Sequence, residues 1–246
     1  MFEHIFYRGK IIFENELFKH YHTAEMLLLY DGNFLQFKRM PSLEECEKAV
    51  EYLKEFHQKN GQEHIKLLFP ENEKITGELE RYFKQSGFES GLMEVYHILP
   101  SQFLNIVKKP NIVIQKVTID NWGQFTKLAY EIDAEISEDF AMHKKVIHEK
   151  NFKSPKFMQL IAFYDGKLAG TVDVILGEDT AEIDGLVVLP SYRNKGIGSH
   201  LQQFVMEECA DKRVILVADG EDTPKEMYKK QNYQYAGFKY EALLVY

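Results

Sequence analysis

The sequence has two cysteines, one tryptophan and no long apolar run near its start, and these shortages exclude several classes of protein. Cys46 and Cys209 are too few for a disulfide framework and lack the paired spacing of a zinc site. We therefore expect a cytoplasmic protein without a bound metal. Charged residues interrupt every apolar run among the first sixteen residues, so neither a signal peptide nor a membrane span is expected there.

Positive charge is also in deficit. The chain has 30 Lys and Arg against 38 Asp and Glu, a net charge of −8, which argues against binding to nucleic acid. Apolar residues make up 45% of the chain, enough for a packed core. The 246 residues suffice for one large domain or for two of roughly 100–150 residues each.

The second half of the chain alternates predicted strands with predicted helices. Between two strands, Asp165-Gly166 is typical of a type I′ hairpin turn. Thr223 is predicted as the N-cap of a helix, with Pro224 at its first position. The order strand, helical pair, three strands, helix, strand, helix, strand predicts a mixed α/β (α+β) sheet. The predicted strands cover residues 112–117, 157–164, 167–176, 181–189, 214–217 and 235–246.

The first half repeats part of this plan. Pro41-Ser42 aligns with Pro190-Ser191, and the segment 83–88 aligns with 228–233. We interpret this as a partial internal repeat, although a chance match of short segments would give the same pattern. The predicted domains are residues 1–105 and 111–246, with a linker near residues 100–110.

The segment 191–199 lies between a predicted strand and a predicted helix. The unpaired N–H groups of a helix N-terminus favour an anion there. Gly196 and Gly198 let the backbone approach a pyrophosphate closely, and Arg193 and Lys195 add positive charge. The pattern predicts an anion site.

Three phosphate-binding patterns compete for this loop. The segment lacks the G-x-x-x-x-G-K-[ST] sequence of a P-loop. A dinucleotide fingerprint needs a third glycine where Leu201 stands, but Asp219 follows at the end of the next strand, so a nucleotide-binding α/β protein stays open. A lone Gly-x-Gly is also often a tight turn.

Residues 181–198 read AEIDGLVVLPSYRNKGIG, and this segment resembles the acetyl-CoA motif of the GNAT superfamily of acyl-CoA N-acyltransferases. That motif is a strand, a turn with proline, and Arg/Gln-x-x-Gly-x-Gly/Ala opening a helix. The resemblance covers residues 111–246 and implies a GNAT-type fold in tandem with a degenerate first half. It also implies an N-acetyltransferase that moves an acetyl group from acetyl-CoA to a primary amine of a small molecule or peptide.

The resemblance further implies which residues hold acetyl-CoA. Backbone groups of Leu186, Val187 and Val188 are expected to pair with the pantetheine arm. Acidic Glu221-Asp222 replaces the family's asparagine before the next helix, and Thr223 is expected to substitute for it. The pyrophosphate is expected on backbone N–H groups of Arg193, Asn194, Lys195, Gly196, Ile197, Gly198 and Ser199.

The first half offers a comparison for this loop. Glu44 aligns with Arg193, and Ser42 and Glu45 are predicted to form a capping box that occupies the helix N-terminus with a protein carboxylate. We therefore expect no CoA binding in the first half.

The resemblance assigns catalytic roles by position. Tyr228 stands where the family carries its general acid, although a core tyrosine would fit the same helix, and its repeat counterpart Phe83 has no hydroxyl. Glu182 and Asp184 are two apart and share one face of a strand on which the family often carries a carboxylate that relays the amine proton. A surface-facing acidic pair is the alternative. A backbone N–H near Leu186 and Val187, where the family strand is bulged, is expected to polarise the thioester.

Acidic residues crowd the segment that forms the acceptor wall in the resembled family. They would suit a cationic amine, although a solvated helix face gives the same pattern. His143 and His148 are expected at the surface. A CoA-binding sensor or scaffold without turnover is the alternative function. The acidic residues are Glu131, Asp133, Glu135, Glu138 and Asp139.

Overall fold

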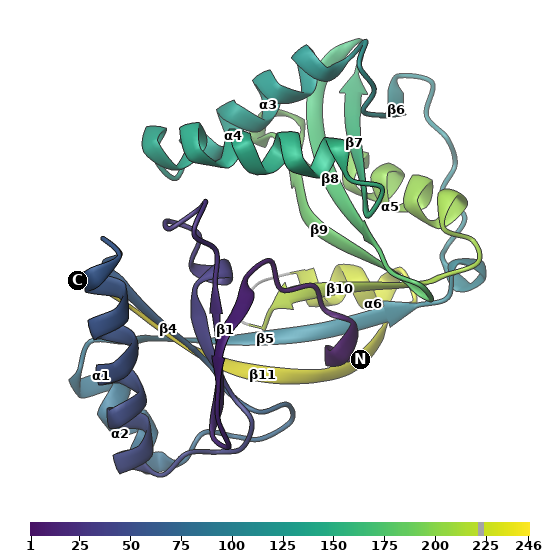
Figure 1. The fold of residues 1–246 in the computed structure, drawn as a ribbon. Helices are drawn as coiled ribbons and strands as arrows, with labels where there is room; N and C mark the ends of the chain where they lie inside the picture. The colour runs from purple at the N-terminus through teal and green to yellow at the C-terminus, as the bar shows by residue number, and fades with distance from the viewer. Residues whose placement is uncertain (221–223) are drawn as a thin grey trace. The chain divides into compact units, whose positions relative to one another are not determined.

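The structure is a computed structural model that describes residues 1–220 and 224–246, and it divides into two compact units (Figure 1). The first unit comprises Met1–Val95, Ala218–Lys225 and Ala236–Tyr246, and the second comprises Tyr96–Val217 and Glu226–Tyr235. Among the described residues, no helix is both long enough and apolar enough to cross a membrane.

Five strands of an eleven-stranded sheet belong mainly to the second unit. Neighbouring strands from β6 to β9 are antiparallel, whereas β9 and β10 are parallel, which confirms the predicted mixed α/β sheet. Asp165 and Gly166 have φ values of 48° and 74°, as a type I′ turn requires. In sheet order the strands are β10 (Arg213–Asp219), β9 (Thr180–Val188), β8 (Lys167–Leu176), β7 (Phe157–Tyr164) and β6 (Ile112–Lys116).

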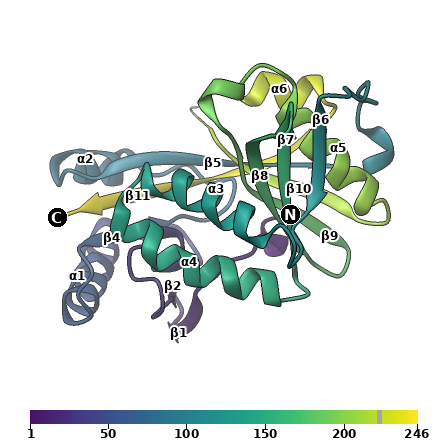
Figure 2. The same cartoon turned by 90° about the horizontal axis from the view of Figure 1, so that it is seen from above.

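Helices cover both faces of this sheet. Figure 1 shows α3 (Trp122–Ala134) and α4 (Glu138–Lys153) on one side of β7 and β8, with α5 (Ile197–Glu208) on the other. Figure 2 shows β6, β7 and β8 side by side. Phe125, Leu128 and Ala129 of α3 are buried in a cluster with Ile161 of β7, so the apolar stripe of α3 fixes this helix on the sheet. A short helix, α6 (Pro224–Lys230), follows β10.

Six strands of the same eleven-stranded sheet belong mainly to the first unit, which also contains helices α1 (Leu43–Lys59) and α2 (Gly77–Gln85). Strands β3 and β4 are parallel, and the pairs β1–β2, β2–β3 and β4–β11 are antiparallel. The short 3₁₀ helices of the chain are η1 (Phe2–His4), η2 (Tyr30–Gly32), η3 (Pro100–Gln102) and η4 (Pro190–Tyr192). In sheet order the strands are β1 (Lys10–Glu14), β2 (Phe18–His22), β3 (Phe34–Phe37), β4 (His64–Leu68), β11 (Gln234–Val245) and β5 (Glu89–Ile98).

The internal repeat is present in the topology. The order β3–α1–β4–α2–β5 in the first half matches β9–α5–β10–α6–β11 in the second, and in both the first two strands are parallel. The first half has no strand and helix pair before β1 that would correspond to β6, α3 and α4. It is therefore a second, reduced copy of the same fold.

The last strand of the chain belongs to the first unit, so the units interleave rather than follow one another as residues 1–105 and 111–246. Residues 241–245 of β11 pair with residues 64–68 of β4. Ala242 is fully buried in a core with Leu53 of α1 and Phe83 of α2. Because this apolar face of β11 completes the core of the first unit, the strand is held there.

Candidate active site

Parallel strands β9 and β10 are joined along only part of their length. Residues 180–183 of β9 pair with residues 213–216 of β10, and the ladder ends at Ile183 and Leu216. In the described part of the chain, the register of β9 with β10 does not extend to residues 185–188 of β9, although β10 continues to Asp219. The edge of β9 that faces β10 therefore presents backbone groups to a ligand strand at this point.

A β-bulge lies in the same stretch of β9. Thr171 of β8 pairs with Val187, but Asp173 pairs with Asp184, so β9 carries one extra residue between these pairs. Gly185 has a φ of 58°, a left-handed conformation suited to glycine. The expected bulge next to Leu186 and Val187 is confirmed, and it turns backbone groups out of the ladder at the end of the sheet.

The loop after β9 delivers the N-terminus of α5 to this end of the sheet. Gly196 is the N-cap residue with a φ of 94°, and Asn194 has a φ of 62°. A glycine N-cap supplies no side chain to bond the N–H groups of the first turn, which are therefore left for a ligand. A Cβ at Gly198 would lie only 3.7 Å from Leu186, so the helix begins close against β9.

Two residues that sequence analysis missed support the loop from outside it. Lys109 Nζ donates a hydrogen bond to the Lys195 carbonyl at 2.9 Å, and the Lys109 N–H donates to His200 Nε2 at 3.2 Å. His200 Nδ1 lies 2.8 Å from the Gly196 carbonyl oxygen. Lys109 therefore adds a third cation to Arg193 and Lys195 beside the helix N-terminus.

The predicted basic side chains take different positions. Lys195 Nζ lies 4.6 Å from the ring centre of Tyr164 and 5.3 Å from that of Tyr192, so its charge rests on two aromatic faces. Arg193 is exposed, and its Nε donates to the Val188 carbonyl at 3.3 Å. Ser199 Oγ accepts a hydrogen bond from Gln231 Nε2 of the segment after α6. Thr223 lies outside the described residues.

Tyr228 stands on α6 among aromatic rings of the second unit. Its ring centre is 5.4 Å from that of Tyr96 and 5.6 Å from that of Tyr233, and the residue is half-buried. Its counterpart Phe83 is fully buried in the core of the first unit. The half-exposed position of Tyr228 is compatible with a hydroxyl that contacts a ligand.

The two carboxylates of β9 differ in exposure. Glu182 is 7% exposed, whereas Asp184 is exposed at the edge of the bulge. Asp184 is the register partner of Asp173 on β8, so their side chains share one face of the sheet. Asp173 accepts hydrogen bonds from the buried side-chain amides of Asn151 at 2.9 Å and Gln159 at 3.1 Å. The structure thus places Asp173, which sequence analysis missed, beside Asp184.

The acidic segment does not form one wall. Asp133 is 3% exposed and binds Lys144 Nζ at 2.9 Å and His148 Nε2 at 2.8 Å, both from α4. Burial alone would raise the pKa of Asp133, but the hydrogen bond from His148 and the charge of Lys144 outweigh it and hold this pKa below its ordinary value. The expectation of a surface His148 was wrong, because this histidine ties α4 to α3.

The other acidic residues of the segment are at the surface. Glu138 accepts a hydrogen bond from Tyr130, and Asp139 pairs with His143, which is exposed as expected. Glu131 and Glu135 are exposed on α3 and at its end. Only exposed carboxylates such as these, and not Asp133, remain available to an amine.

We expect Asp133→Asn to lower the free energy of unfolding by about 2 kcal/mol, because it leaves Lys144 and His148 without their shared anion. Urea denaturation followed by the fluorescence of the single tryptophan, Trp122 on α3, measures this change. Asp139→Asn on exposed α4 is the matched control and should change stability by less than about 0.5 kcal/mol. Equal effects of the two substitutions would contradict the role of Asp133.

The N-terminus of α1 is closed, as predicted. Ser42 Oγ accepts from the Glu45 N–H, and the Glu45 carboxylate accepts from the Ser42 N–H. Arg39 binds Glu45 in addition and, with the Ser42 N–H, lowers the Glu45 pKa to about 2. This helix terminus is therefore already neutralised by the protein itself, in contrast to that of α5.

Comparison with protein families also separates the two halves of the chain. Residues 121–233 match the family described as acetyltransferase (GNAT) family, and residues 1–96 match a domain of unknown function, DUF5613. The second half of the chain is therefore an acetyltransferase domain of the GNAT class.

Solved structures extend the likeness to the whole chain. A functionally unknown conserved protein from Staphylococcus epidermidis ATCC 12228 is 32% identical, covers 99% of this chain and 96% of its own, and superposes with a TM-score of 0.90. The chain belongs to the same family as that protein, and within this family its second half is a GNAT domain. A search of curated proteins gave no match.

More distant structures share the fold. A GCN5-related N-acetyltransferase from Kribbella flavida is 13% identical, with a TM-score of 0.61 over 95% of this chain and 88% of its own. A tandem GNAT protein from the clavulanic acid biosynthesis pathway is 10% identical, with a TM-score of 0.52 over 86% and 75% of the two chains. The tandem GNAT-type fold expected from the sequence is confirmed.

Proposed function

We propose that the protein is an N-acetyltransferase that transfers the acetyl group of acetyl-CoA to a primary amine of a small molecule or peptide. The main observation in support of this proposal is that β9 and β10 stop pairing beside the N-terminus of α5, which has no side-chain cap. An open strand edge suits the amide groups of pantetheine, and a helix N-terminus suits a pyrophosphate.

The residues present fit acetyl-CoA. Backbone N–H groups from Arg193 to Ser199 would hold the pyrophosphate, with positive charge from Lys109 beside them. Gly196 has a φ of 94°, which a residue with a Cβ adopts only with strain, so the backbone conformation of this loop depends on glycine. Backbone groups of Leu186, Val187 and Val188 would hold the pantetheine arm, and Thr223 remains a proposed contact.

Acetyl-CoA supplies an activated acetyl group as a thioester, and the protein must bring the substrate's amine into its neutral form. An amine with a pKa of about 10.4 is neutral in roughly one molecule in two thousand at pH 7, a deficit of roughly 4–5 kcal/mol. Glu182 and Asp184, directly or through water, would take the amine proton. Asp173 would help to bind the cationic form of the amine before it loses that proton.

Tyr228 would protonate the departing thiolate as the carbon–sulfur bond breaks. A phenol of pKa about 10 and a thiol of pKa about 8.5 differ by about 1.5 units, so the transfer costs only about 2 kcal/mol when the two groups are held in contact. The bulged backbone near Leu186 would polarise the acetyl carbonyl through an N–H group. These roles need one half-exposed hydroxyl and one N–H that the sheet does not use.

Tyr228→Phe should lower kcat about 100-fold and leave the Kd of acetyl-CoA nearly unchanged, because only the acid is removed. Steady-state turnover over a panel of primary amines, with calorimetry for acetyl-CoA, measures both quantities. Tyr235→Phe is the matched control, since the Tyr235 ring also packs on Tyr96, at 5.6 Å.

An unaltered kcat in Tyr228→Phe would remove Tyr228 from the mechanism. Binding of acetyl-CoA without turnover of any amine would instead favour a CoA-binding sensor.

A further inference from the structure

A pocket of about 350 Å³ lies in the first unit, the half that lacks the acetyl-CoA loop. Strands β2, β3 and β11 and the segment after β4 all contribute to it. Its volume is at the lower end of the range for small-molecule sites, about 300–1,000 Å³. The lining residues are Lys19, Gln36, Phe37, Lys38, Pro70, Glu71, Glu73 and Lys239.

The pocket lies where parallel strands β3 and β4 end. Leu35 and Leu67, a register pair, face the core formed with α1 and α2, so Gln36 and its partner Leu68 face the other side of the sheet. Ligands of α/β sheets bind outside the carboxyl ends of parallel strands. The first half thus has a cavity at the place that corresponds to the end of the β9–β10 pairing in the second half.

Lys239 is the most deeply buried of the three lysines that line the pocket. The residue is 5% exposed, and within the described ranges no carboxylate lies within ion-pair distance of its Nζ. Its one described contact is the face of Phe2, 4.6 Å from Nζ to the ring centre. Burial lowers the pKa of Lys239, and the charges of Glu71 and Glu3 only partly oppose this effect. An ammonium in this position is desolvated without a partner, which is costly.

Lys66 provides a contrast on the same sheet. It is 7% exposed, but it binds Asp31 and, at 3.0 Å, Glu241. Burial lowers its pKa, yet the two carboxylates outweigh burial and raise the pKa above its ordinary value. The first unit therefore neutralises one buried lysine fully and leaves Lys239 to the pocket.

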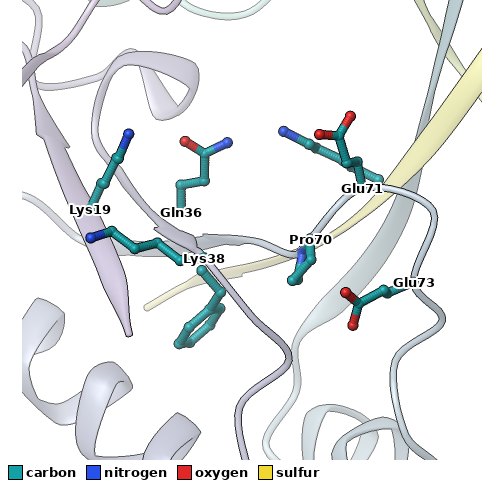
Figure 3. Close-up of a pocket in the computed structure, with 8 residues that line it drawn as sticks. Lys19, Gln36, Lys38, Pro70, Glu71 and Glu73 are labelled. Carbon is teal, nitrogen blue, oxygen red and sulfur yellow. The ribbon is translucent and has the colours of Figure 1, made fainter. Parts of the chain in front are cut away.

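The wall of the pocket is fixed by hydrogen bonds. The Asn72 N–H donates to the Phe238 carbonyl at 2.8 Å, and Asn72 Oδ1 accepts from the Phe238 N–H at 3.1 Å. This double contact ties the Pro70–Glu73 loop to β11 beside Lys239. Figure 3 shows the polar groups of Lys19, Gln36 and Glu71 directed to one side of the strands, with the Glu73 carboxylate apart from them.

Three lysines and two glutamates line this site, and the most buried of the five is Lys239. Lys19 is half-buried and has no ion pair in the described part of the chain, whereas Lys38 is held by Glu14 at 2.6 Å. The two glutamates of the lining are exposed, so water screens their charge more than that of Lys239. We propose that this pocket binds a small molecule through an oxyanion, a carboxylate or a phosphate, that pairs with Lys239 and Lys19 and accepts a hydrogen bond from Gln36.

The test uses inorganic phosphate and malonate as probes for the two oxyanion types. All titrations are made in the full-length Gly196→Glu variant, because phosphate also suits the α5 loop of the second unit. Calorimetry and the NMR signal of the Gln36 side-chain amide report binding. This proposal does not rest on acetyl transfer, and no activity is measured.

At least one probe should bind and shift the Gln36 signal, and the tighter probe identifies the oxyanion type. Lys239→Met should weaken this binding at least about tenfold, because a charge-assisted hydrogen bond is lost. Without a probe, the same substitution should raise Tm by about 2–4 °C, since it removes a desolvated cation. Lys84→Met on exposed α2 is the control and should change neither quantity.

Two results would overturn the proposal. One is the absence of a Gln36 shift with both probes. The other is a Lys239→Met variant that binds the probe normally and has a lower Tm, which would make Lys239 a structural partner of Phe2.

Discussion

Replacing Gly196 with Glu should weaken acetyl-CoA binding roughly a thousandfold, or about 4 kcal/mol, while the fold is kept. Gly196 is the N-cap of α5 with a φ of 94°, and in the proposed site its N–H and those that follow would face the pyrophosphate. A carboxylate there would occupy the positive end of the helix and pair with Lys109, whose Nζ lies 3.4 Å from the position of the new Cβ.

Two further substitutions separate charge from backbone strain. Gly196→Ala has the same strained φ without the carboxylate, so its Kd should lie between those of the wild type and Gly196→Glu. Gly61→Glu is the matched control, because Gly61 has a φ of 71°, has open space around its Cβ position and lies in the first unit. It should lose about 1 kcal/mol of stability and no affinity.

Calorimetry with acetyl-CoA on the three variants measures these affinities, and urea denaturation confirms that each is folded. A wild-type Kd in Gly196→Glu would remove the loop from the cofactor site.

The loop could be predicted from sequence because its geometry is local. A strand, a turn with Pro190 and two glycines at the start of a helix specify the position of the N–H groups without any distant residue. The closed terminus of α1 was equally local, since Ser42 and Glu45 are three residues apart. In each half, residues only a few positions apart indicate whether the helix N-terminus is open to an anion or closed by a protein carboxylate.

Contacts between distant residues were not predictable in this way. Lys109 reaches the Lys195 carbonyl across 86 residues, and nothing in its own segment marks that contact. Nor did the sequence indicate that β11 pairs with β4, because an alternating strand has no local mark of its partner. Asp133 looked the same as its acidic neighbours until burial against α4 distinguished it.

Buried histidines explain why strand β2 was missed. The sequence Phe-Lys-His-Tyr-His alternates, but its inward position after Phe18 is His20, which is polar by composition and fully buried in the structure. His20 packs on Phe56 at 4.6 Å and bonds the Tyr52 hydroxyl at 3.0 Å. A neutral imidazole thus serves as a core residue here. Because an imidazole can be protonated, the stability of the first unit depends on pH.

Acidification should destabilise the first unit well before ordinary carboxylates titrate. Burial, together with the neighbouring His57 and His22, lowers the His20 pKa from 6.5 to about 3. Burial lowers the His57 pKa from 6.5 to about 4, although the bond from its Nδ1–H to the His64 carbonyl, at 2.5 Å, opposes the shift. In the folded state, His20 Nε2 and His57 Nε2 are buried without a hydrogen-bond partner among the described residues.

The sign of the effect follows from linkage. Above pH 6.5 both histidines are neutral in the folded and in the unfolded chain, so they do not reduce the free energy of unfolding. Below pH 6.5 only the unfolded chain takes up protons, and stability falls by about 1.4 kcal/mol per pH unit for each histidine. At about pH 4.5 the two histidines together have lowered the free energy of unfolding by about 5 kcal/mol. This loss ends only below the pKa values that the histidines have in the folded chain.

His20→Phe should remove about half of the pH dependence that His20 and His57 contribute together, because phenylalanine fills the site with no group to protonate; His22 and His64, whose pKa values burial also lowers, keep their own contributions. Urea denaturation at a series of pH values, with hydrogen exchange of peptides from β2 and α1, reports the first unit. Trp122 fluorescence reports the second unit, whose buried Asp133 has a pKa below its ordinary value and gives up its stabilisation only at lower pH.

His143→Gln on exposed α4 is the control and should keep the full wild-type pH dependence. If stability stayed level between about pH 6.5 and 4.5, or if His20→Phe left the slope unchanged, the buried histidines would not be the proton-linked groups. Because His20 and His57 contact each other's aromatic neighbours, with ring centres 6.2 Å apart, protonating one makes the second harder to protonate. Two histidines give a slope of about 2.8 kcal/mol per pH unit and one gives about 1.4, so the slope of stability against pH distinguishes the pair from a single site.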